Sequence, residues 1–508
     1  MTQEQLFEPV PSEKFAQLSK EELITLLKGE QNLRYKMYKY IKKLETLNEE
    51  LKQKSFLVDE QLITIKNKLF GKSSERSRLY KDKQPKTSGL DKKKRVLLPS
   101  ERYPRAPLIE RHITLDNPPA CSCCGSEMKD SGLTEESEYL TKVPAQYYVV
   151  HQIRHKYACQ SCHGDIKTAP NPPRIKEGSS LSDEMMVDVA LSKYCDLIPI
   201  ERQAKIASRE GLSELPAQSL IEATHYVAEF VQPAYEKLKE ECLKAKVLHA
   251  DETPHRMLEG DKKSSWFLWG FSTKTASYFE YHSTRSADVA SSLLSKSNCE
   301  FLASDVYTGY AKAVKDANKE REAQERPLIA HVYCNAHARR YFRQSFEKYE
   351  SEALYFVKQY RKIYRLESLA KKYPSEAHRI RPRMLKYFQK IRDKCLSDVA
   401  GYSSKSSLAK AMNYFLKNYE GLTRFISDPE LPIDNNCQER LLRNPVIGRK
   451  TWYGTHSKLG AKTAAILFSL VESCKLNNVN PREYFKALVQ ELHAGLPAKT
   501  PYQFKLNQ

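Results

Sequence analysis

The chain has 508 residues, with 83 Lys or Arg against 63 Asp or Glu, which gives a formal net charge of +20. This length accommodates several domains, and the basic balance is expected of a protein that binds a polyanion such as nucleic acid. No apolar run approaches the roughly 20 residues that span a bilayer, and the amino terminus lacks the features of a secretory signal. These observations exclude a membrane-bound or secreted class and predict a cytoplasmic protein.

Residues 11–70 are expected to be helical, because the segment is largely free of proline and glycine. Its apolar residues alternate in steps of four and three, which is a heptad pattern: Leu33, Met37, Tyr40, Leu44, Leu47 and Leu51. The pattern predicts a coiled coil through which copies of the chain form a homo-oligomer. Lys54 interrupts it, and Val58, Leu62, Ile65 and Leu69 resume the pattern with a one-residue slip, as at a local discontinuity of a coiled coil. The alternative is an amphipathic helix that packs on its own chain.

Residues 71–107 are rich in Lys, Arg, Ser, Gly and Pro and poor in apolar residues. Such a composition cannot form a hydrophobic core. The segment is therefore either a flexible linker or an arm that contacts DNA, and residues 92–95, a run of four cations, suit the second function.

Residues 108–175 contain two Cys-x-x-Cys pairs, Cys121 with Cys124 and Cys159 with Cys162. In a chain of this length, twelve cysteines with such paired spacing favour reduced thiols and a metal over disulfides. Two thiolates from each pair complete the tetrahedral shell of zinc, so the segment is predicted to be a small four-cysteine zinc ribbon with strands at residues 139–140 and 147–150. Cys123 can compete with Cys124 as a ligand. The site is structural, because four protein ligands leave no open coordination position.

Residues 176–244 are predicted to be helical, with helices at 201–209 and 216–227 separated by a turn. A helix-turn-helix would insert its second helix into the major groove of DNA. The second helix carries little positive charge, so a simple helical hairpin is an equal alternative.

Residues 245–490 show the pattern of a mixed sheet. Strands are expected at residues 247–250, 266–271, 277–281, 300–304 and 329–333, the second and third forming a hairpin. The first and fourth are apolar runs that end in Asp251 and Asp305, and such a strand delivers its terminal carboxylate to the edge of a sheet. Residues 338–430 form a basic helical insertion whose aromatic residues favour core packing over base stacking. Residues 491–508 are expected to be a C-terminal tail.

The third acidic position follows the insertion. With the two aspartates, Glu439 would supply hard carboxylate oxygens for magnesium or manganese and for phosphoryl transfer on nucleic acid. On local grounds a capping box with Asn436, or an ion pair with Arg443, explains Glu439 equally well. Asp434 is the alternative third ligand, although its place before two asparagines suits a helix N-cap. Nearby basic and aromatic residues are candidates for DNA contacts: Arg443, Arg449, Lys450 and Trp452.

Four sequence strings, taken in order, resemble the insertion sequence 66 family of DDE transposases. They are HADET at 249–253, DVYTGY at 305–310, CNAHARR at 334–340 and DNNCQER at 434–440. The string at 69–75 and the paired cysteines extend the resemblance over nearly the whole chain.

The resemblance implies a multidomain α/β protein with a ribonuclease H-like catalytic core and a helical insertion, preceded by the coiled coil and the zinc ribbon. It implies a transposase that binds double-stranded DNA at its insertion sequence ends and target, then cleaves and joins strands, with accessory proteins of the same element as further candidate partners. It favours Glu439 as the third metal ligand beside Asp251 and Asp305. Two other functions stay open, a DNA-binding regulator without catalysis and a nuclease without strand transfer.

Overall fold

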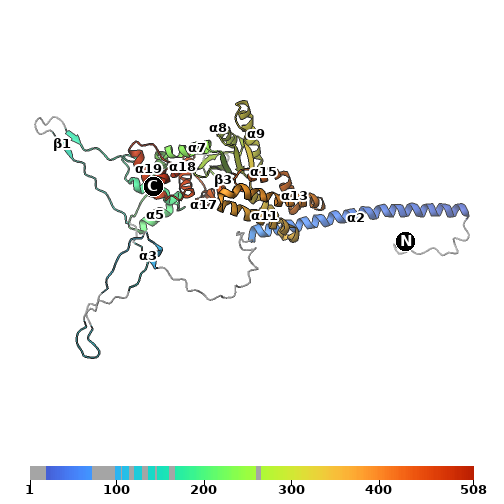
Figure 1. The fold of residues 1–508 in the computed structure, drawn as a ribbon, viewed down its shortest axis with the longest axis horizontal. Helices are drawn as coiled ribbons and strands as arrows, with labels where there is room; N and C mark the ends of the chain where they lie inside the picture. Colours follow the sequence, from blue (N-terminus) through green and yellow to red (C-terminus); the bar gives the residue numbers. More distant parts are fainter. Residues whose placement is uncertain are drawn as a thin grey trace. The chain divides into compact units, whose positions relative to one another are not determined.

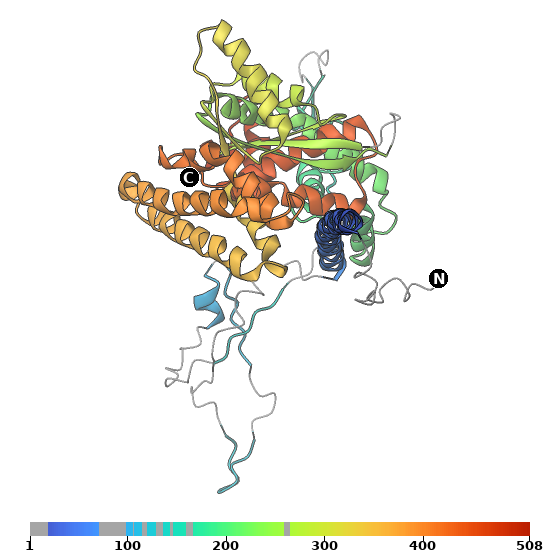
Figure 2. The same ribbon diagram turned by 90° about the vertical axis from the view of Figure 1, so that its right-hand side faces the viewer.

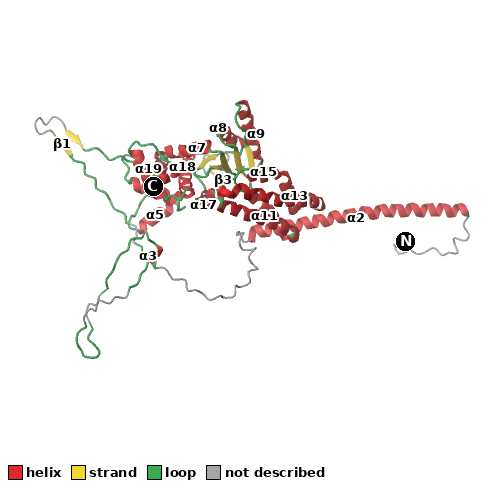
Figure 3. Cartoon of the chain, viewed as in Figure 1, coloured by secondary structure: helices red, strands yellow, loops and turns green. Residues whose placement is uncertain are grey.

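The computed structural model describes residues 19–70, 98–104, 106–113, 119–128, 136–142, 146–158, 166–258 and 265–507. Figure 3 colours their helices, strands and loops. The chain divides into two compact units. One comprises residues 1–71, 171–203 and 216–508, and the other comprises residues 72–170 and 204–215. None of the described helices is long and apolar enough to cross a membrane.

The N-terminal helix, α2 (Lys20–Phe70), is a single helix of 51 residues. It begins with a reciprocal cap in which the Ser19 backbone N–H donates to the Glu22 carboxylate at 2.8 Å and the Glu22 N–H donates to Ser19 Oγ at 3.4 Å. The six heptad residues are all exposed along α2. The helix continues through Lys54, so the change of register does not interrupt its hydrogen bonding. Residues 11–18 lie outside the described residues.

The zinc-binding segment contains one described knuckle. Ala120 pairs with Glu127 across a tight turn, within which the Gly125 N–H donates to the Cys121 carbonyl at 2.9 Å. Gly125 has φ +74°, a conformation that glycine adopts without strain. Strands β1 (Lys156–Ala158) and β2 (Ile166–Thr168) form an antiparallel hairpin.

Cys159 and Cys162 lie in the connection between β1 and β2, outside the described residues, as do residues 71–97 of the basic segment. The short helix α3 (Pro99–Arg102) follows that segment. The strands predicted at 139–140 and 147–150 are wrong. Both stretches are exposed and neither forms a strand, because a β-branched and aromatic composition makes no strand without a neighbouring strand to bond.

Four helices precede the sheet: α4 (Asp183–Tyr194), α5 (Ile200–Arg209), α6 (Ala217–Phe230) and α7 (Gln232–Lys244). The two predicted helices correspond to α5 and α6. Helix α6 has no Lys or Arg, and it packs on α4 and on α18 (Lys458–Leu476). This packing and composition do not favour α6 as a helix that reads DNA, and the helical hairpin stays a prediction.

The central sheet has five strands in the order β5-β4-β3-β6-β7. Strands β3 (Val247–Arg256), β4 (Ser265–Ser272) and β5 (Ser277–His282) are antiparallel, while β6 (Phe301–Ser304) and β7 (Ala330–Tyr333) run parallel to β3. Helices α8 (Ala287–Lys296) and α9 (Thr308–Ala323) connect β5 to β6 and β6 to β7. All five predicted strands are confirmed, and β3 is longer than expected because β4 pairs with it as far as Arg256.

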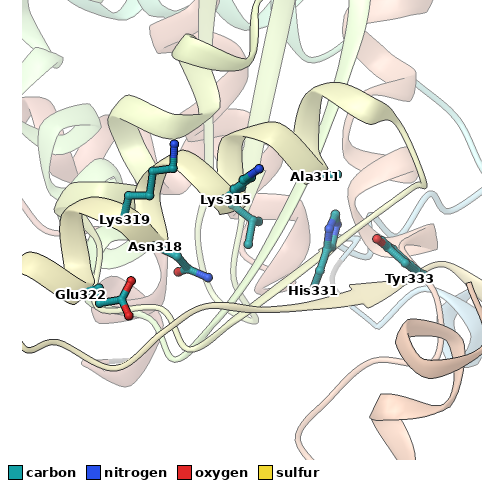
Figure 4. Close-up of a pocket in the computed structure, with 8 residues that line it drawn as sticks. Ala311, Lys315, Asn318, Lys319, Glu322, His331 and Tyr333 are labelled. Atoms are coloured by element: carbon teal, nitrogen blue, oxygen red, sulfur yellow. The ribbon is translucent and has the colours of Figure 1, made fainter.

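The two edges of the sheet differ. Along β5, the backbone N–H groups of Ser277 and Phe279 donate to the hydroxyls of Ser473 and Ser469 on α18, each at 2.9 Å. Helix α18 thereby satisfies groups that would otherwise be open to pairing with another chain. At the other edge, an open cleft of about 450 Å³ lies between α9 and β7 (Figure 4), and none of the three predicted acids lines it.

The insertion is helical, as predicted, and its helices gather beside the sheet (Figure 1 and Figure 2). Its aromatic side chains form a core in which Phe342 and Phe356 stack at 4.3 Å, and Tyr360, Phe388 and Phe415 are fully buried. The longer helices are α10 (Asn335–Gln344), α11 (Glu350–Lys372), α13 (Leu385–Asp398) and α14 (Ser407–Lys417). The shorter ones are η2 (Ser345–Glu347), η3 (Pro374–Glu376), α12 (Ala377–Ile380), η4 (Arg381–Met384), η5 (Val399–Gly401), α15 (Tyr419–Thr423) and η6 (Arg424–Ile426).

A buried arginine fixes the exit from the insertion. Arg381 pairs through Nε and Nη2 with the Glu367 carboxylate at 3.1 and 2.9 Å. Its Nη1 donates to the backbone carbonyls of Phe425, Asp428 and Leu431 at 2.8–2.9 Å. Because Leu431 lies just upstream of the third acidic string, this arginine restrains the backbone that leads to it.

The chain ends with α16 (Asn436–Leu441), α17 (Arg443–Trp452), α18, α19 (Pro481–His493) and α20 (Pro501–Leu506). The expected tail after residue 490 is largely a packed segment. Thr500 is buried and donates to Glu241 at 2.7 Å, and the Tyr484 hydroxyl donates to the Lys499 carbonyl at 2.7 Å.

Candidate functional site

Asp251 lies on β3 beyond the end of the parallel pairing with β6, which stops at His249 and Ala303. The alternation of a strand places Asp251 on the same face as His249 and Thr253. Burial and the charges of Glu252, Asp305 and Glu439 raise the pKa of the Asp251 carboxyl to about 8. The three predicted acids therefore lie within electrostatic reach of one another.

Asp305 follows the last residue of β6. Its Oδ1 accepts the backbone N–H of Tyr307 at 3.1 Å, and this turn leads directly into α9. The Ser304 hydroxyl donates to the Asp305 carbonyl at 2.7 Å. The turn holds the Asp305 carboxylate at the carboxyl end of the parallel strands, where the sequence pattern predicted it.

Glu439 comes from α16, a helix of six residues that Asn435 attaches to β3. Asn435 Nδ2 donates to the Ala250 carbonyl at 2.8 Å, and its Oδ1 lies 2.8 Å from His249 Nδ1. The Asn435 backbone N–H donates to Cys334 Sγ at 3.2 Å. Sequence reasoning missed this residue, although the Asn-Asn pair after Asp434 was a signal for it.

Helix α16 also lies directly against the sheet beside Asp251. Gly270 pairs with Asp251 across β3 and β4, and a Cβ at Gly270 would lie 2.1 Å from Gln438 Nε2. Gln438 is fully buried, and neither atom of its amide has a hydrogen-bond partner among the described residues. Only glycine at position 270 leaves room for this approach, and the buried amide adds an unsatisfied polar group next to the acids.

The two candidates for the third ligand have different surroundings. Asp434 accepts the Tyr364 hydroxyl at 3.1 Å through Oδ2 and the Asn436 N–H at 3.3 Å through Oδ1. The N-cap residue of α16 is Asn435 rather than Asp434, which corrects the expected N-cap role of Asp434. The Oε1 atom of Glu439 is buried and has no hydrogen-bond partner in the described part of the chain. Glu439 thus keeps an oxygen free for a ligand, while both oxygens of Asp434 are engaged.

Two nitrogen-bearing side chains beside Glu439 belong to α10. His337 Nδ1 lies 3.7 Å from Oε1, and Arg340 Nη2 lies 3.7 Å from Oε2. Cys334, at the start of α10, brings a thiol to the same place, and one donor atom each from Cys334, His337 and Glu439 lie within 4.8 Å of one another. Burial raises the pKa of the Cys334 thiol to about 12. Neither Cys334 nor His337 was expected as a site residue, although both stand in the string at 334–340.

Glu252 faces the opposite side of β3 from Asp251. Arg285 Nε donates to its Oε1 at 2.7 Å and the Tyr310 hydroxyl donates to its Oε2 at 2.5 Å. Its carboxylate is therefore already paired, which makes Glu252 a poor candidate for a metal ligand.

The acids fit a divalent cation. Hard carboxylate oxygens are the usual ligands of magnesium and manganese. Three carboxylates whose charges oppose one another, one of them with an unpartnered buried oxygen, gain most from a cation of charge two.

The described zinc knuckle favours a thiolate. Hydrogen bonds from the Ser126 backbone and hydroxyl, and from Cys121, lower the pKa of the exposed Cys124 thiol. Zinc binds cysteine as the thiolate, so these donors suit a ligand. Cys123 is also exposed at this turn, and Cys159 and Cys162 lie outside the described residues.

The four residues predicted to contact DNA do not share one environment. Arg443 and Lys450 are exposed on α17, while Arg449 Nη1 donates to Thr253 Oγ1 at 3.2 Å, two residues from Asp251. Trp452 packs on Gly448 and meets Tyr194 edge-on at 6.3 Å. The more accessible aromatic ring is Tyr453, which is 73% exposed.

Comparison with known proteins gives two family matches. Residues 178–463, more than half of the chain, match the model of the IS66 family of transposases. Residues 118–163 match the model of the zinc-finger binding domain of these transposases.

Three relatives come from Sinorhizobium fredii (strain NBRC 101917 / NGR234), each named only as an uncharacterized protein. The protein y4jD is 28% identical over 410 residues, which cover 77% of this chain and 79% of the relative. The protein y4hP is 24% identical over 403 residues, covering 74% and 71%. The protein y4qI is 26% identical over 437 residues, covering 82% and 79%.

Proposed function

Because the chain belongs to the IS66 family of transposases, we propose that it binds the DNA ends of its insertion sequence and cleaves and joins DNA strands at Asp251, Asp305 and Glu439. The observation that carries this proposal is the electrostatic coupling of the three carboxylates, which come from segments nearly 190 residues apart in sequence. An acidic cluster of this kind is costly without a cation, so its place at the end of a sheet supports a metal-dependent active site.

The core is ribonuclease H-like in this proposal. Its support is the strand order, in which three antiparallel strands are followed by two parallel strands with helical connections. Asp251 on the central strand and Asp305 on its parallel neighbour then belong to one edge of the sheet.

Magnesium or manganese, when bound, lowers the pKa of a water or a DNA 3′-hydroxyl and neutralises the leaving oxygen. The chain's own residues hold the metal ions and fix the positions of the ligands. Asp251 is the central ligand, since the charges of both other acids act on it. Asn435 fixes α16 so that Glu439 is held against β3. Arg285 and Tyr310 engage Glu252, which limits the negative charge that Glu252 adds beside Asp251.

DNA contacts follow from charge and exposure. Arg443 and Lys450 are accessible for phosphate contacts, and Tyr453 is the exposed ring that suits a displaced base. Arg449, held at Thr253, brings a guanidinium close to the acids, where a scissile phosphate would lie. Trp452 has a packing role in this scheme.

The zinc finger and helix α2 have roles in DNA recognition and in oligomer assembly. Zinc held by Cys121, Cys124, Cys159 and Cys162 stabilises the finger, which supports a DNA-binding role by its family match. The exposed heptad face of α2 supports assembly of a cytoplasmic homo-oligomer through a coiled coil. Accessory proteins of the same element remain candidate partners.

The test uses Asp251→Asn, Asp305→Asn and Glu439→Gln in the full chain, assayed with magnesium on DNA that carries the element's ends. Each change removes one negative charge and nearly keeps the shape, so cleavage and strand transfer should be lost together while end binding survives. Glu320→Gln, an exposed carboxylate on α9, is the matched control and should stay active.

Three outcomes separate the alternatives. Full activity in all three acid variants means that the protein is a DNA-binding regulator or uses another site. Cleavage without joining in the unaltered chain identifies a nuclease. Activity that survives Glu439→Gln and is lost in Asp434→Asn moves the third ligand to Asp434.

A further inference from the structure

A second set of potential metal ligands lies at the start of α10. Cys334 occupies the N-cap position of this helix and His337 its first turn, while Glu439 reaches the same place from α16. One donor atom from each residue, a sulfur, a nitrogen and an oxygen, lies within 4.8 Å of the other two. The magnesium site proposed above uses only one of these three residues.

Two of the three residues contribute buried atoms that have no partner. Neither His337 Nδ1 nor Glu439 Oε1 forms a hydrogen bond in the described part of the structure, although both atoms are buried and lie 3.7 Å apart. A buried polar atom without a partner costs roughly 1–3 kcal/mol. Two such atoms that face each other indicate a missing group that binds both.

The Cys334 sulfur has a hydrogen-bond donor of the kind found at metal-bound cysteines. The Asn435 backbone N–H donates to Cys334 Sγ at 3.2 Å. Backbone N–H groups directed at a ligand sulfur stabilise a thiolate and are a common second layer around metal-bound cysteine. Asn435 also holds α16 to β3, so the same residue orients both Cys334 and the helix of Glu439.

From these contacts we propose that Cys334, His337 and Glu439 bind Zn²⁺, at a site distinct from the zinc finger. Sulfur, imidazole and carboxylate together match the ligands of zinc, whereas magnesium prefers oxygen alone. With usual zinc–ligand bond lengths, tetrahedral ligands lie about 3.4–3.6 Å apart. The observed 3.7 Å between Nδ1 and Oε1 is close to that range, and contraction of about 1 Å brings in the sulfur.

Arg340 brings a positive charge to the same three residues. Its Nη1 lies 3.4 Å from His337 Nε2 and its Nη2 lies 3.7 Å from Glu439 Oε2. Zinc at Nδ1 requires a proton on Nε2, so Arg340 must turn away, and its half-exposed side chain is free to do so. Three protein ligands leave one position open, as in zinc sites that bind water or an exogenous group.

Sharing of Glu439 gives this site a regulatory consequence. Zinc bound by Glu439 competes with the magnesium ions for the same carboxylate, so zinc should inhibit cleavage. This consequence depends on the proposed transposase activity, whereas zinc binding itself does not.

Cobalt is the probe, because Co²⁺ substitutes for zinc and its bond to a thiolate absorbs light. The full chain, stripped of metal, should bind two equivalents of Co²⁺ that show this thiolate absorption, one in the finger and one at Cys334. Only these equivalents are counted, because cobalt held by the carboxylates of Asp251 and Asp305 lacks the absorption. Cys334→Ser and His337→Gln should each weaken one equivalent by at least about tenfold and leave the other intact. Zinc should displace both equivalents.

Matched controls are Cys395→Ser, another buried thiol in the insertion, and His378→Gln, an exposed histidine on α12. Both should retain two equivalents. Circular dichroism checks that each variant folds. If Cys334→Ser does not fold, His337→Gln still tests the site, because His337 is partly exposed and its replacement keeps the core packing. Asp251→Asn should retain both equivalents while losing cleavage, so failure of the zinc site and failure of the proposed function give different results.

A single cobalt equivalent in the unaltered chain overturns the zinc site. The same conclusion follows if Cys334→Ser and His337→Gln, both folded, bind cobalt as the controls do.

Discussion

Replacing Asp251 with Asn should stabilise the metal-free protein at pH 8, although the residue is proposed to be essential for cleavage. In the folded chain, burial and three neighbouring carboxylates raise the pKa of Asp251 to about 8. In the unfolded chain the same carboxyl titrates near its ordinary value of about 3.9. Above that pH the unfolded state has already released the proton that the folded state still holds.

The sign and size of the change in the free energy of unfolding follow from this difference in pKa. The contribution of Asp251 to the free energy of unfolding is complete below about pH 4 and is lost as the pH rises towards 8, at about 1.4 kcal/mol per pH unit. A shift of about four units sets an upper limit of about 6 kcal/mol. Because Asp251 is only partly buried, we expect about 2–4 kcal/mol in favour of Asp251→Asn at pH 8.

The assay is urea unfolding of both proteins in a chelator, from pH 5 to pH 9. Burial lowers the pKa of His249, His255 and His331, but these groups titrate in both proteins and cancel in the difference. Magnesium should then stabilise the unaltered chain, more strongly at pH 8 than at pH 5, and should have little effect on Asp251→Asn.

Glu320→Gln, an exposed carboxylate on α9, should follow the unaltered chain at every pH. Parallel stability curves for Asp251→Asn and the unaltered chain, or a less stable variant at pH 8, would show that the carboxylates do not share a buried site.

Three further predictions concern the scaffold. Arg381→Met should lower the free energy of unfolding by about 3–5 kcal/mol, because it leaves the buried Glu367 carboxylate with only the exposed Lys371 at 3.9 Å. Adding Glu367→Leu should recover much of the loss, and equal losses in the single and double variants would contradict this. Gly270→Ala should destabilise the core by about 1–3 kcal/mol and reduce cleavage by displacing α16, and adding Gln438→Ala should partly restore both stability and cleavage. Wild-type activity in Gly270→Ala would show that α16 tolerates displacement. Leu44→Asp should shift the protein towards monomers in analytical ultracentrifugation without changing the unfolding of the core, whereas an unchanged mass would exclude the coiled coil.

Local periodicity was enough to predict much of the core. The five strands, the helical insertion and the packing of its aromatic residues each depend on a pattern within one segment. Alternation along β3 places Asp251 and His249 on one face and Glu252 on the other. The same approach failed at residues 139–140 and 147–150, since a strand also needs a partner that no local pattern specifies.

The sequence by itself determined which residue types were available: two aspartates that follow apolar runs, a third acid beyond the insertion, and cysteine pairs with zinc spacing. The tertiary structure adds that Glu439 and Asp434 have different surroundings, because among the described residues Oε1 of Glu439 has no hydrogen-bond partner while both oxygens of Asp434 accept hydrogen bonds. The contacts of Asn435, Cys334 and His337 beside the acids also became visible only in the tertiary structure. Their roles arise from contacts between residues about 100 to 190 positions apart, and such contacts depend on how helices and strands pack, which no local periodicity records.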